Sequence, residues 1–243
     1  MSPVDTDSLS ITGIMIRFLL IFSPLIALAA WFLSSAQAAS TAEWNPLFDG
    51  KTLNGWVQRG GKAKFSVAHG EIVGSSVPGT GNSFLCTTRD YTNFVLELDF
   101  KTVSGLNSGV QIRSHAFDVP TEFDHNGKVI RIPAGRVHGY QIEIDPSERA
   151  WSGGVFEEGR RGWLGNLKTN EAARATYRSN DWNQFRIEAT AGMIKTSING
   201  VPAVGLKDAV TRSGFVGLQV HGVGNRTNVM EVRFRNIRIQ ELP

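Results

Sequence analysis

Three short stretches of the sequence carry side chains that could do chemistry. They read GVQIRS (109–114), GYQIEID (139–145) and GLQVHG (217–222), and in each of them apolar and polar residues alternate. A period of two is typical of a β-strand with one face in the core. The polar positions hold three glutamines, one arginine, one glutamate and one histidine: Gln111, Gln141, Gln219, Arg113, Glu143 and His221.

If the three strands lie in one sheet, these six side chains form a single polar face. Such a face can donate hydrogen bonds to hydroxyl and carbonyl groups and accept them in return. It can also move protons near neutral pH through the glutamate and the histidine. The alternative is an ordinary exposed face of an antiparallel sheet, with cross-strand glutamine pairs and one Arg–Glu pair. The residues alone leave both interpretations open.

A second carboxylate lies close by in sequence but does not suit direct glycoside hydrolysis. Asp145 follows Glu143 by two residues, which places the two side chains ~7 Å apart on one strand face. The paired carboxylates of glycosidases instead flank the scissile bond from opposite sides. Asp145 also precedes Pro146, and we interpret it as a turn residue.

Two long segments, 115–138 and 146–178, show no clear strand pattern. Loops of this length in a compact domain are more often functional than accidental. In the second segment Arg160 and Arg161 come just before Trp163. An indole beside guanidinium donors suits the apolar face and the hydroxyls of a sugar ring. Alternatively, Trp163 packs the loop onto the core, which is the commoner use of a tryptophan.

The rest of the chain after residue 40 consists of short alternating or apolar runs separated by turn residues. Asn199-Gly200 between two such runs is a strong hairpin signal. Many short strands without a long amphipathic helix predict an all-β fold, a sandwich or jelly roll. We expect one such domain over residues 39–243.

The N-terminus reads as a targeting segment. Residues 18–33, FLLIFSPLIALAAWFL, are almost wholly apolar, and Ala36-Gln37-Ala38 fits a small-x-small cleavage site. Residues 1–38 are therefore predicted to be a signal peptide. A transmembrane anchor is the alternative, but Pro24 and the Ala-rich end favour cleavage. We expect an exported protein, periplasmic or secreted, with no membrane contact after cleavage.

Charge and cysteine content exclude several classes of function. The formal net charge is only +3, and the densest basic run, RFRNIR (233–238), alternates with apolar residues. This run is interpreted as a solvated strand face, and we expect no nucleic-acid partner. Cys86 is the single cysteine, which excludes an intrachain disulfide and a cysteine-based metal site. No cofactor is indicated, and a divalent metal is left open because no spaced ligand motif is present.

Five motifs in this order make the chain recognisable as a family member. NSGVQIRS, GRVHGYQIEIDP, WSGGVFEEGRRGWL, GFVGLQVHG and VRFRNIRI follow FDGKTLNGW. Together they resemble the 3-keto-disaccharide hydrolase family, from about Trp44 to Leu242. The resemblance implies a concanavalin A-like jelly roll with its site on one concave sheet. It also implies action on glycosides already oxidised at sugar C3, by net hydrolysis or by 1,2-elimination.

Cleavage of a 3-keto-glycoside would give the side chains of the polar face specific roles. A ketone at C3 acidifies the C2 proton, so the protein needs a base, a group that stabilises the enolate oxygen and an acid for the leaving group. We expect Glu143 or His221 to transfer protons and Arg113, with Gln141 or Gln219, to hold the keto oxygen. The remaining expected substrate contacts are Asn107, Gln111, His138, Arg160, Arg161 and Trp163.

Two other functions stay open on the sequence. One is a non-catalytic, lectin-like carbohydrate-binding module, since this fold also presents sugar sites without chemistry. The other is a structural or adhesion domain with the polar face at an interface. The expected partner is an oxidised glycoside or another carbohydrate, and the oligomeric state is undetermined.

Overall fold

A computed structural model describes residues 43–243 of the chain. The predicted signal peptide, residues 1–38, lies outside the described residues. The described residues belong to one compact unit. They contain one short helix, α1 (Glu171–Ala175), and no helix that is long and apolar enough to cross a membrane.

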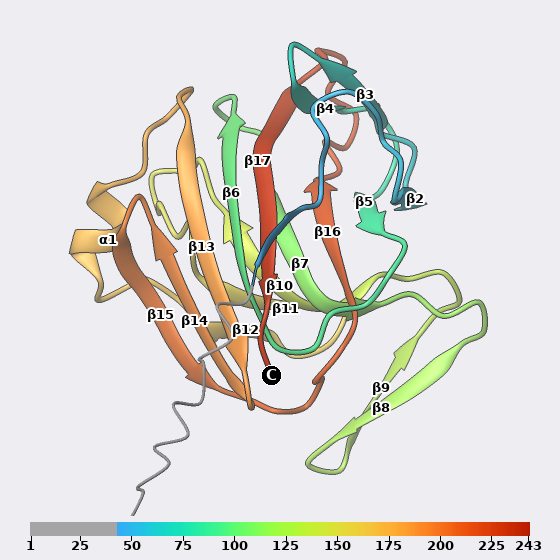
Figure 1. Ribbon diagram of the computed structural model, residues 1–243. Coiled ribbons are helices and arrows are strands. Elements are labelled where there is room, and N and C mark those ends of the chain that lie inside the picture. Colours follow the sequence, from blue (N-terminus) through green and yellow to red (C-terminus); the bar gives the residue numbers. More distant parts are fainter. Residues whose placement is uncertain (1–42) are drawn as a thin grey trace, which may run out of the picture. The chain divides into compact units, whose positions relative to one another are not determined.

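The architecture is two antiparallel sheets packed face to face, with a separate two-stranded hairpin (Figure 1). One sheet follows the order β15 (Val201–Lys207), β14 (Met193–Ile198), β13 (Asn183–Thr190), β6 (Phe94–Thr102), β17 (Glu231–Glu241), β4 (Glu71–Ser75), β3 (Lys64–Ala68), with β1 (Trp44–Pro46) also paired to β17. The other follows the order β12 (Gly162–Gly165), β11 (Val155–Glu158), β10 (His138–Ile144), β7 (Ser108–His115), β16 (Phe215–Val220), β5 (Ser83–Thr87), β2 (Trp56–Gly60). The prediction of an all-β sandwich is confirmed.

The core lies between the two sheets and is built from alternate residues of their strands. Along β6 the buried positions recur at every second residue from Leu96 onward, as expected for a strand with one face inside. Phe100 of β6 and Phe185 of β13 are fully buried there, with ring centroids 4.4 Å apart. The hairpin predicted at Asn199-Gly200 joins β14 to β15, and both residues have positive φ (50° and 82°), as the tight turn requires.

The three strands of the polar stretches are neighbours, as the sequence interpretation required. β7 lies between β10 and β16 in the seven-stranded sheet. Gln141 is directly opposite Gln111, and Gln111 is opposite Gly217. These residues therefore share one cross-strand row on the outer face of this sheet.

A β-bulge interrupts the alternation of β7 at Arg113. The register of β7 shifts against both neighbouring strands near this point, and Arg113 has a φ of 45°. The chain segments on both sides of this bulge carry a glycine, and a side chain there would collide with β7. A Cβ at Gly139 would meet Ser114, and one at Gly214 would lie 2.5 Å from the Arg113 carbonyl carbon. The bulge turns Arg113 away from the face that Gln111 occupies.

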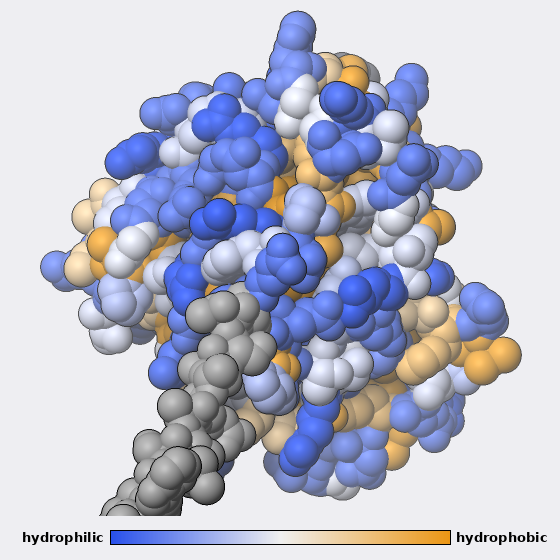
Figure 2. All heavy atoms as spheres, in the orientation of Figure 1, coloured by the Kyte–Doolittle hydropathy of each residue, from blue (hydrophilic) through white to orange (hydrophobic). Residues whose placement is uncertain are grey.

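The two segments without a clear strand pattern do contain strands. Segment 115–138 forms a hairpin of β8 (Thr121–His125) and β9 (Lys128–Ile132), which extends from the sandwich (Figure 1). The second segment forms β11, β12 and α1. The surface in Figure 2 is mostly hydrophilic, and hydrophobic residues gather at the lower right, where the hairpin lies. The exposed apolar side chains of this region include Phe117, Val119 and Val129.

Replacing Phe100 with alanine should destabilise the fold strongly. A fully buried phenylalanine truncated to alanine loses transfer free energy and leaves a cavity, at a cost of about 3–5 kcal/mol in the free energy of unfolding. Urea denaturation measures this change. The control is Val129→Ala on the exposed hairpin surface, for which we expect a change within about 0.5 kcal/mol. A small effect of Phe100→Ala would contradict the described core.

Candidate active site

A cleft of about 440 Å³ opens on the outer face of the seven-stranded sheet. It lies over β10, beside the hairpin of β11 and β12. Its lining combines two arginines, two carboxylates, two amides, one histidine and an aromatic wall: Arg136, Arg149, Glu143, Glu158, Asn107, Gln141, His221, Phe156 and Trp163, with Gly159. The polar face is therefore not an ordinary solvated sheet surface.

Glu143 stands at the buried end of this cleft. Its oxygens accept hydrogen bonds from Asn107 Nδ2 at 2.7 Å and Gln141 Nε2 at 2.9 Å. Arg149 lies 4.0 Å from the same carboxylate. Burial raises the pKa of Glu143 to about 7, although the two amide donors and Arg149 oppose the rise. A carboxyl group with such a pKa can exchange protons at neutral pH.

Gln141 is itself held by the other two glutamines. Its Oε1 accepts hydrogen bonds from Gln111 Nε2 at 2.6 Å and Gln219 Nε2 at 2.9 Å. The sequence predicted all three as substrate contacts. The structure places only Gln141 at the cleft, since Gln111 and Gln219 are fully buried (0% exposed each) and do not line it.

His221 follows directly after β16 and lies at the rim of the cleft. Its ring is exposed, and Nδ1 lies 2.8 Å from the carbonyl oxygen of Gly222. The predicted meeting of His221 and Glu143 on one face is therefore present in the structure. No described residue forms a hydrogen bond with Nε2 of this ring, so Nε2 is able to reach a ligand.

Arg113 is not part of the cleft, contrary to the sequence interpretation. Its guanidinium Nε donates to the carbonyl oxygen of Thr92 at 2.7 Å, and its Nη2 lies 3.4 Å from Asn93 Oδ1. The side chain is 1% exposed. The alternation rule failed here because the bulge in β7 cannot be recognised from the apolar pattern.

The cations of the cleft are instead Arg149 and Arg136, which the sequence interpretation missed. Arg149 Nε donates to Asp145 Oδ2 at 2.8 Å, and its guanidinium packs over the rings of Trp151 and Trp163. Asp145 also accepts hydrogen bonds from Ser147 and Trp151, which confirms it as a turn residue. Both arginines lie in the two long segments without a strand pattern, and this location was the only signal in the sequence that could have indicated them as site residues.

Arg136 reaches the cleft from the segment before β10. It forms an ion pair with Glu158 of β11, so the cleft holds one pair of opposite charges on this side. Trp163 lines the neighbouring wall edge-on to Phe156, with ring centroids 5.4 Å apart. The expected place of Trp163 at the site agrees with the structure.

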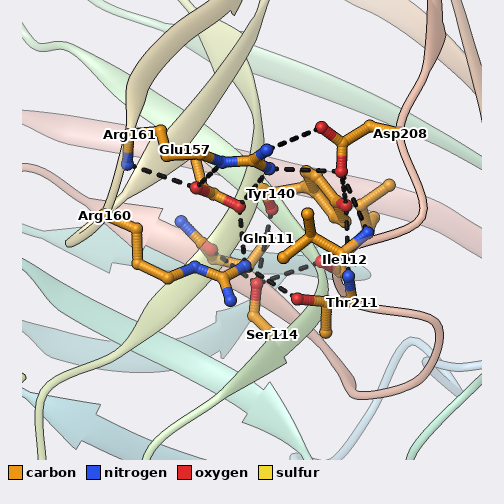
Figure 3. A network of polar contacts seen from close by, with 10 residues as sticks. Gln111, Ile112, Ser114, Tyr140, Glu157, Arg160, Arg161, Asp208 and Thr211 are labelled. Atoms are coloured by element: carbon orange, nitrogen blue, oxygen red, sulfur yellow. Dashed lines mark hydrogen bonds and ion pairs between the residues drawn. The ribbon is translucent and has the colours of Figure 1, made fainter. Parts of the chain in front are cut away.

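Arg160 and Arg161 have a different partner from the expected one. Both bind the buried carboxylate of Glu157, and Arg161 also binds Asp208, which accepts the hydroxyl of Tyr140 (Figure 3). Neither arginine lines the cleft. They fix the β11–β12 hairpin to the β15–β16 connection and offer no free guanidinium to a sugar.

His138 is also absent from the lining of the cleft. It is 3% exposed, its Nδ1 lies 2.9 Å from the Arg136 carbonyl oxygen, and its ring packs near those of His115 and Phe117. Burial lowers the pKa of His138 below its usual value. Its side chain supports the segment that carries Arg136.

A larger hollow, about 550 Å³, lies against the outer face of the other sheet. The carboxylates of Glu97 and Asp99 in its lining are both bound by arginines, Glu97 by Arg186 and Arg238 and Asp99 by Arg235. It holds no histidine, and although burial would raise the pKa of Glu97, its arginine partners lower it. The smaller cleft at Glu143 is the better candidate because it combines concavity with a tuned titratable group.

The structure contains no ready cluster for a metal ion among residues 43–243. No three His, Cys, Asp or Glu side chains of this part of the chain are grouped closely enough.

The fold belongs to the class of galectin-like β-sandwiches. Solved structures that share it include a galectin-like protein of unknown function from Bacillus subtilis (15% identity, TM-score 0.57, 82% of this chain and 94% of that chain). Another is the carbohydrate-binding module CBM66 from Bacillus subtilis (18%, 0.53, 77% and 96%). A third is a candidate glycosyl hydrolase from Parabacteroides distasonis ATCC 8503 (22%, 0.51, 82% and 100%).

The family is more specific than the fold. Residues 43–240 match the family described as 3-keto-alpha-glucoside-1,2-lyase-like domain, which is nearly all of the described chain. The chain belongs to this family, and the resemblance found in the sequence motifs is confirmed. No curated protein is similar in sequence at a significant level.

Removing the carboxylate of Glu157 should destabilise the protein without acting through the cleft. Glu157→Ala leaves Arg160 and Arg161 buried without their counter-charge, and breaking a buried ion pair costs about 3–5 kcal/mol. The matched control is Glu122→Ala, which breaks an exposed pair with Arg131 at less than about 1 kcal/mol. Urea denaturation of both variants checks this, and equal small effects would show that the Glu157 network is not structural.

Proposed function

We propose that this protein is an exported lyase or hydrolase of 3-keto-glycosides that works by C2 proton abstraction and elimination of the C1 aglycone. The observation that carries the proposal is the buried carboxyl group of Glu143 in a polar cleft, with a pKa raised to about 7. Membership in the family described as 3-keto-alpha-glucoside-1,2-lyase-like domain supports it. Export rests on residues 1–38 of the sequence, which predict a signal peptide.

The reaction needs few groups because the ketone does most of the activation. A base removes the proton from C2, and the electron pair forms an enolate stabilised by the C3 oxygen. The enolate then expels the C1 substituent, so that a C1–C2 double bond forms as the C1–O bond breaks. Protonation of the leaving oxygen completes the elimination, and addition of water to the product gives net hydrolysis.

The cleft offers one group for each role. Glu143 is the base, since its pKa lies near neutral pH, where a general base is most effective. In the proposed mechanism Arg149, a cation 4.0 Å from Glu143, stabilises the enolate oxygen, which is the role expected of Arg113 from the sequence. His221 at the rim supplies the proton to the leaving aglycone.

Direct hydrolysis of an unoxidised glycoside is less well supported. That reaction requires two carboxyl groups on opposite sides of the bond, one of them free to protonate the leaving group. Glu158, the second carboxylate of the cleft, is engaged by Arg136, and Asp145 is engaged by Arg149 and the turn that follows it. Glu143 has no matching partner in the described residues that line the cleft.

A non-catalytic carbohydrate-binding module is the second candidate. The aromatic wall of Phe156 and Trp163 favours it, because sugar rings stack on such surfaces. A binding module would have no use for a carboxyl group whose pKa is tuned to neutrality. Turnover therefore separates the two candidates.

Replacing Glu143 with glutamine should abolish turnover and preserve the fold. The experiment is NMR of the purified protein with a 3-keto-glucoside and with its unoxidised parent in deuterated buffer. We expect the wild-type protein to cleave only the keto compound, with deuterium at C2 or a 2-hydroxy-3-keto-glycal intermediate. Glu143→Gln should lose about 10²–10⁴-fold in rate, the usual contribution of a general base.

Glu122→Gln on the exposed β8–β9 hairpin is the control and should retain the wild-type rate. Saturable line broadening without turnover by the wild-type protein would favour the binding module. Full activity of Glu143→Gln would remove this residue from the mechanism.

The pH dependence should follow the ionisation of Glu143. A base must be deprotonated, and the pKa of this carboxyl group is raised from 4.5 to about 7. Activity should therefore fall as the pH drops through about 7, whereas an unperturbed glutamate would stay active to about pH 4.5. A profile of kcat/KM against pH measures this, and a flat profile from pH ~5 to ~8, a range that brackets the raised pKa, would exclude Glu143 as the base.

A further inference from the structure

The glutamines beneath the cleft form a directed chain of hydrogen bonds that ends at Glu143. Ser114 Oγ lies 2.7 Å from Gln111 Oε1 and can donate to it. Gln111 donates to Gln141, and Gln141 donates to the carboxylate of Glu143. Figure 3 shows the first link, with Ser114 beside Gln111. Gln219 joins the chain as a second donor to Gln141.

The chemistry of the carboxylate dictates the direction of this chain. An ionised carboxylate has only acceptors, so Gln141 must turn its NH₂ group toward Glu143. Its carbonyl oxygen then points the other way, where it requires donors, and both Gln111 and Gln219 supply an NH₂ group at hydrogen-bond distance. Two donors on one oxygen hold the amide plane of Gln141 in a single orientation.

Burial separates these residues from any ligand. Gln111 and Gln219 are 0% exposed and lie outside the lining of the cleft, whereas Gln141 and Glu143 line it. The side chain of Gln219 donates to Gln141 Oε1, and its own Oε1 has no partner among the described residues. Neither buried glutamine has a surface with which to touch a substrate.

The backbone is shaped to let Gln141 lie flat across β7. A Cβ at Gly109 would come within 2.6 Å of Cγ and Cδ of Gln141, closer than real atoms approach. Glycine at this position thus leaves the space that the Gln141 side chain fills on its way to Glu143. Gly109 does not have a positive φ, so the backbone conformation does not account for this glycine.

We propose that Gln111 and Gln219 are positioning residues which, through Gln141, fix the hydrogen bond that orients the Glu143 carboxylate and tunes its protonation. The proposal rests on the proposed function, because it assigns to Glu143 the role of base. Other charged groups also face this carboxylate or line its cleft: Asp145 and Arg149 after β10, His221 after β16, and the Arg136–Glu158 pair across the cleft. Gln111 and Gln219 are uncharged, so replacing either of them removes none of these charged groups.

The decisive variants are Gln219→Leu and Gln111→Leu, which remove one donor to Gln141 each. With its amide less firmly held, Gln141 donates less well to Glu143, the ionised carboxylate is stabilised less, and its pKa rises. The acid limb of the kcat profile should move to higher pH by up to about one unit, the order of shift expected if the hydrogen bond from Gln141 to the charged carboxylate were lost. We expect kcat at neutral pH to fall and KM to change little.

Gly109→Ala tests the same chain without removing a polar group. The added Cβ displaces the Gln141 side chain by steric contact, so the same upward movement of the acid limb is expected. The matched control is Gly205→Ala in β15, where a Cβ would meet nothing within 4 Å. It should leave both the rate and the pH profile as in the wild-type protein.

A direct titration makes the result independent of the substrate. In protein labelled with ¹³C at the glutamate carboxyl carbons, the Glu143 signal is the one missing from Glu143→Gln. Its midpoint should rise in Gln219→Leu, Gln111→Leu and Gly109→Ala and stay unchanged in Gly205→Ala. If the wild-type protein cleaves no 3-keto-glycoside, the proposed function fails, while this titration still decides the role of the glutamines.

Two outcomes would overturn the inference. An increase in KM with an unchanged Glu143 midpoint would mean that the glutamines bind substrate. Loss of activity with an unchanged midpoint would mean that they only support the fold. If one leucine variant does not fold, Gly109→Ala and the remaining leucine variant still give either answer.

Discussion

A buried carboxylate loses the water that would stabilise its charge, and the candidate site is organised around this cost at Glu143. The protein compensates chiefly with neutral donors, Asn107 and Gln141, and keeps the nearest cation at 4.0 Å. Neutral donors stabilise an anion less than a contacting guanidinium does. The carboxyl group is consequently held in place and still able to take up a proton near neutrality.

Glu157 shows the opposite arrangement only a short distance along the chain. It is fully buried, whereas Glu143 borders the cleft, and two guanidinium groups bind it directly, with Asp208 extending the network. Direct charge pairing suits a carboxylate whose task is to join a hairpin to the sandwich. The two glutamates therefore illustrate how the type of hydrogen-bond donor distinguishes a carboxyl group that can take up a proton near neutral pH from one that is held as a structural ion pair.

Much of the fold followed from the sequence because strand periodicity and turn chemistry are local. The alternation in β6, β7, β10 and β16 and the turn at Asn199-Gly200 required no knowledge of distant contacts. That Glu143 and His221 meet at one cleft also followed, once the three polar stretches were assumed to be neighbours. The assumption came from the family resemblance and not from the spacing of residues.

What could not be predicted depends on contacts between distant segments. Whether Arg161 faces a sugar or Glu157 and Asp208 is decided by how a hairpin folds back, and its sequence context fits either. Arg149 and Arg136 gave no periodic signal because they lie in irregular segments. The prediction for Arg113 was wrong for a different reason, because one extra residue in a strand reverses the side that each later residue faces.

That bulge has a consequence for how the sequence can vary. Arg113 adopts its positive φ between two glycines that lie against β7, Gly139 of β10 and Gly214 just before β16. A side chain at either glycine would collide with β7, and a regular β7 would no longer need either glycine. Residues 113, 139 and 214, far apart in the sequence, are therefore expected to vary together. In a relative whose β7 lacks the bulge, we expect other residues in place of both glycines.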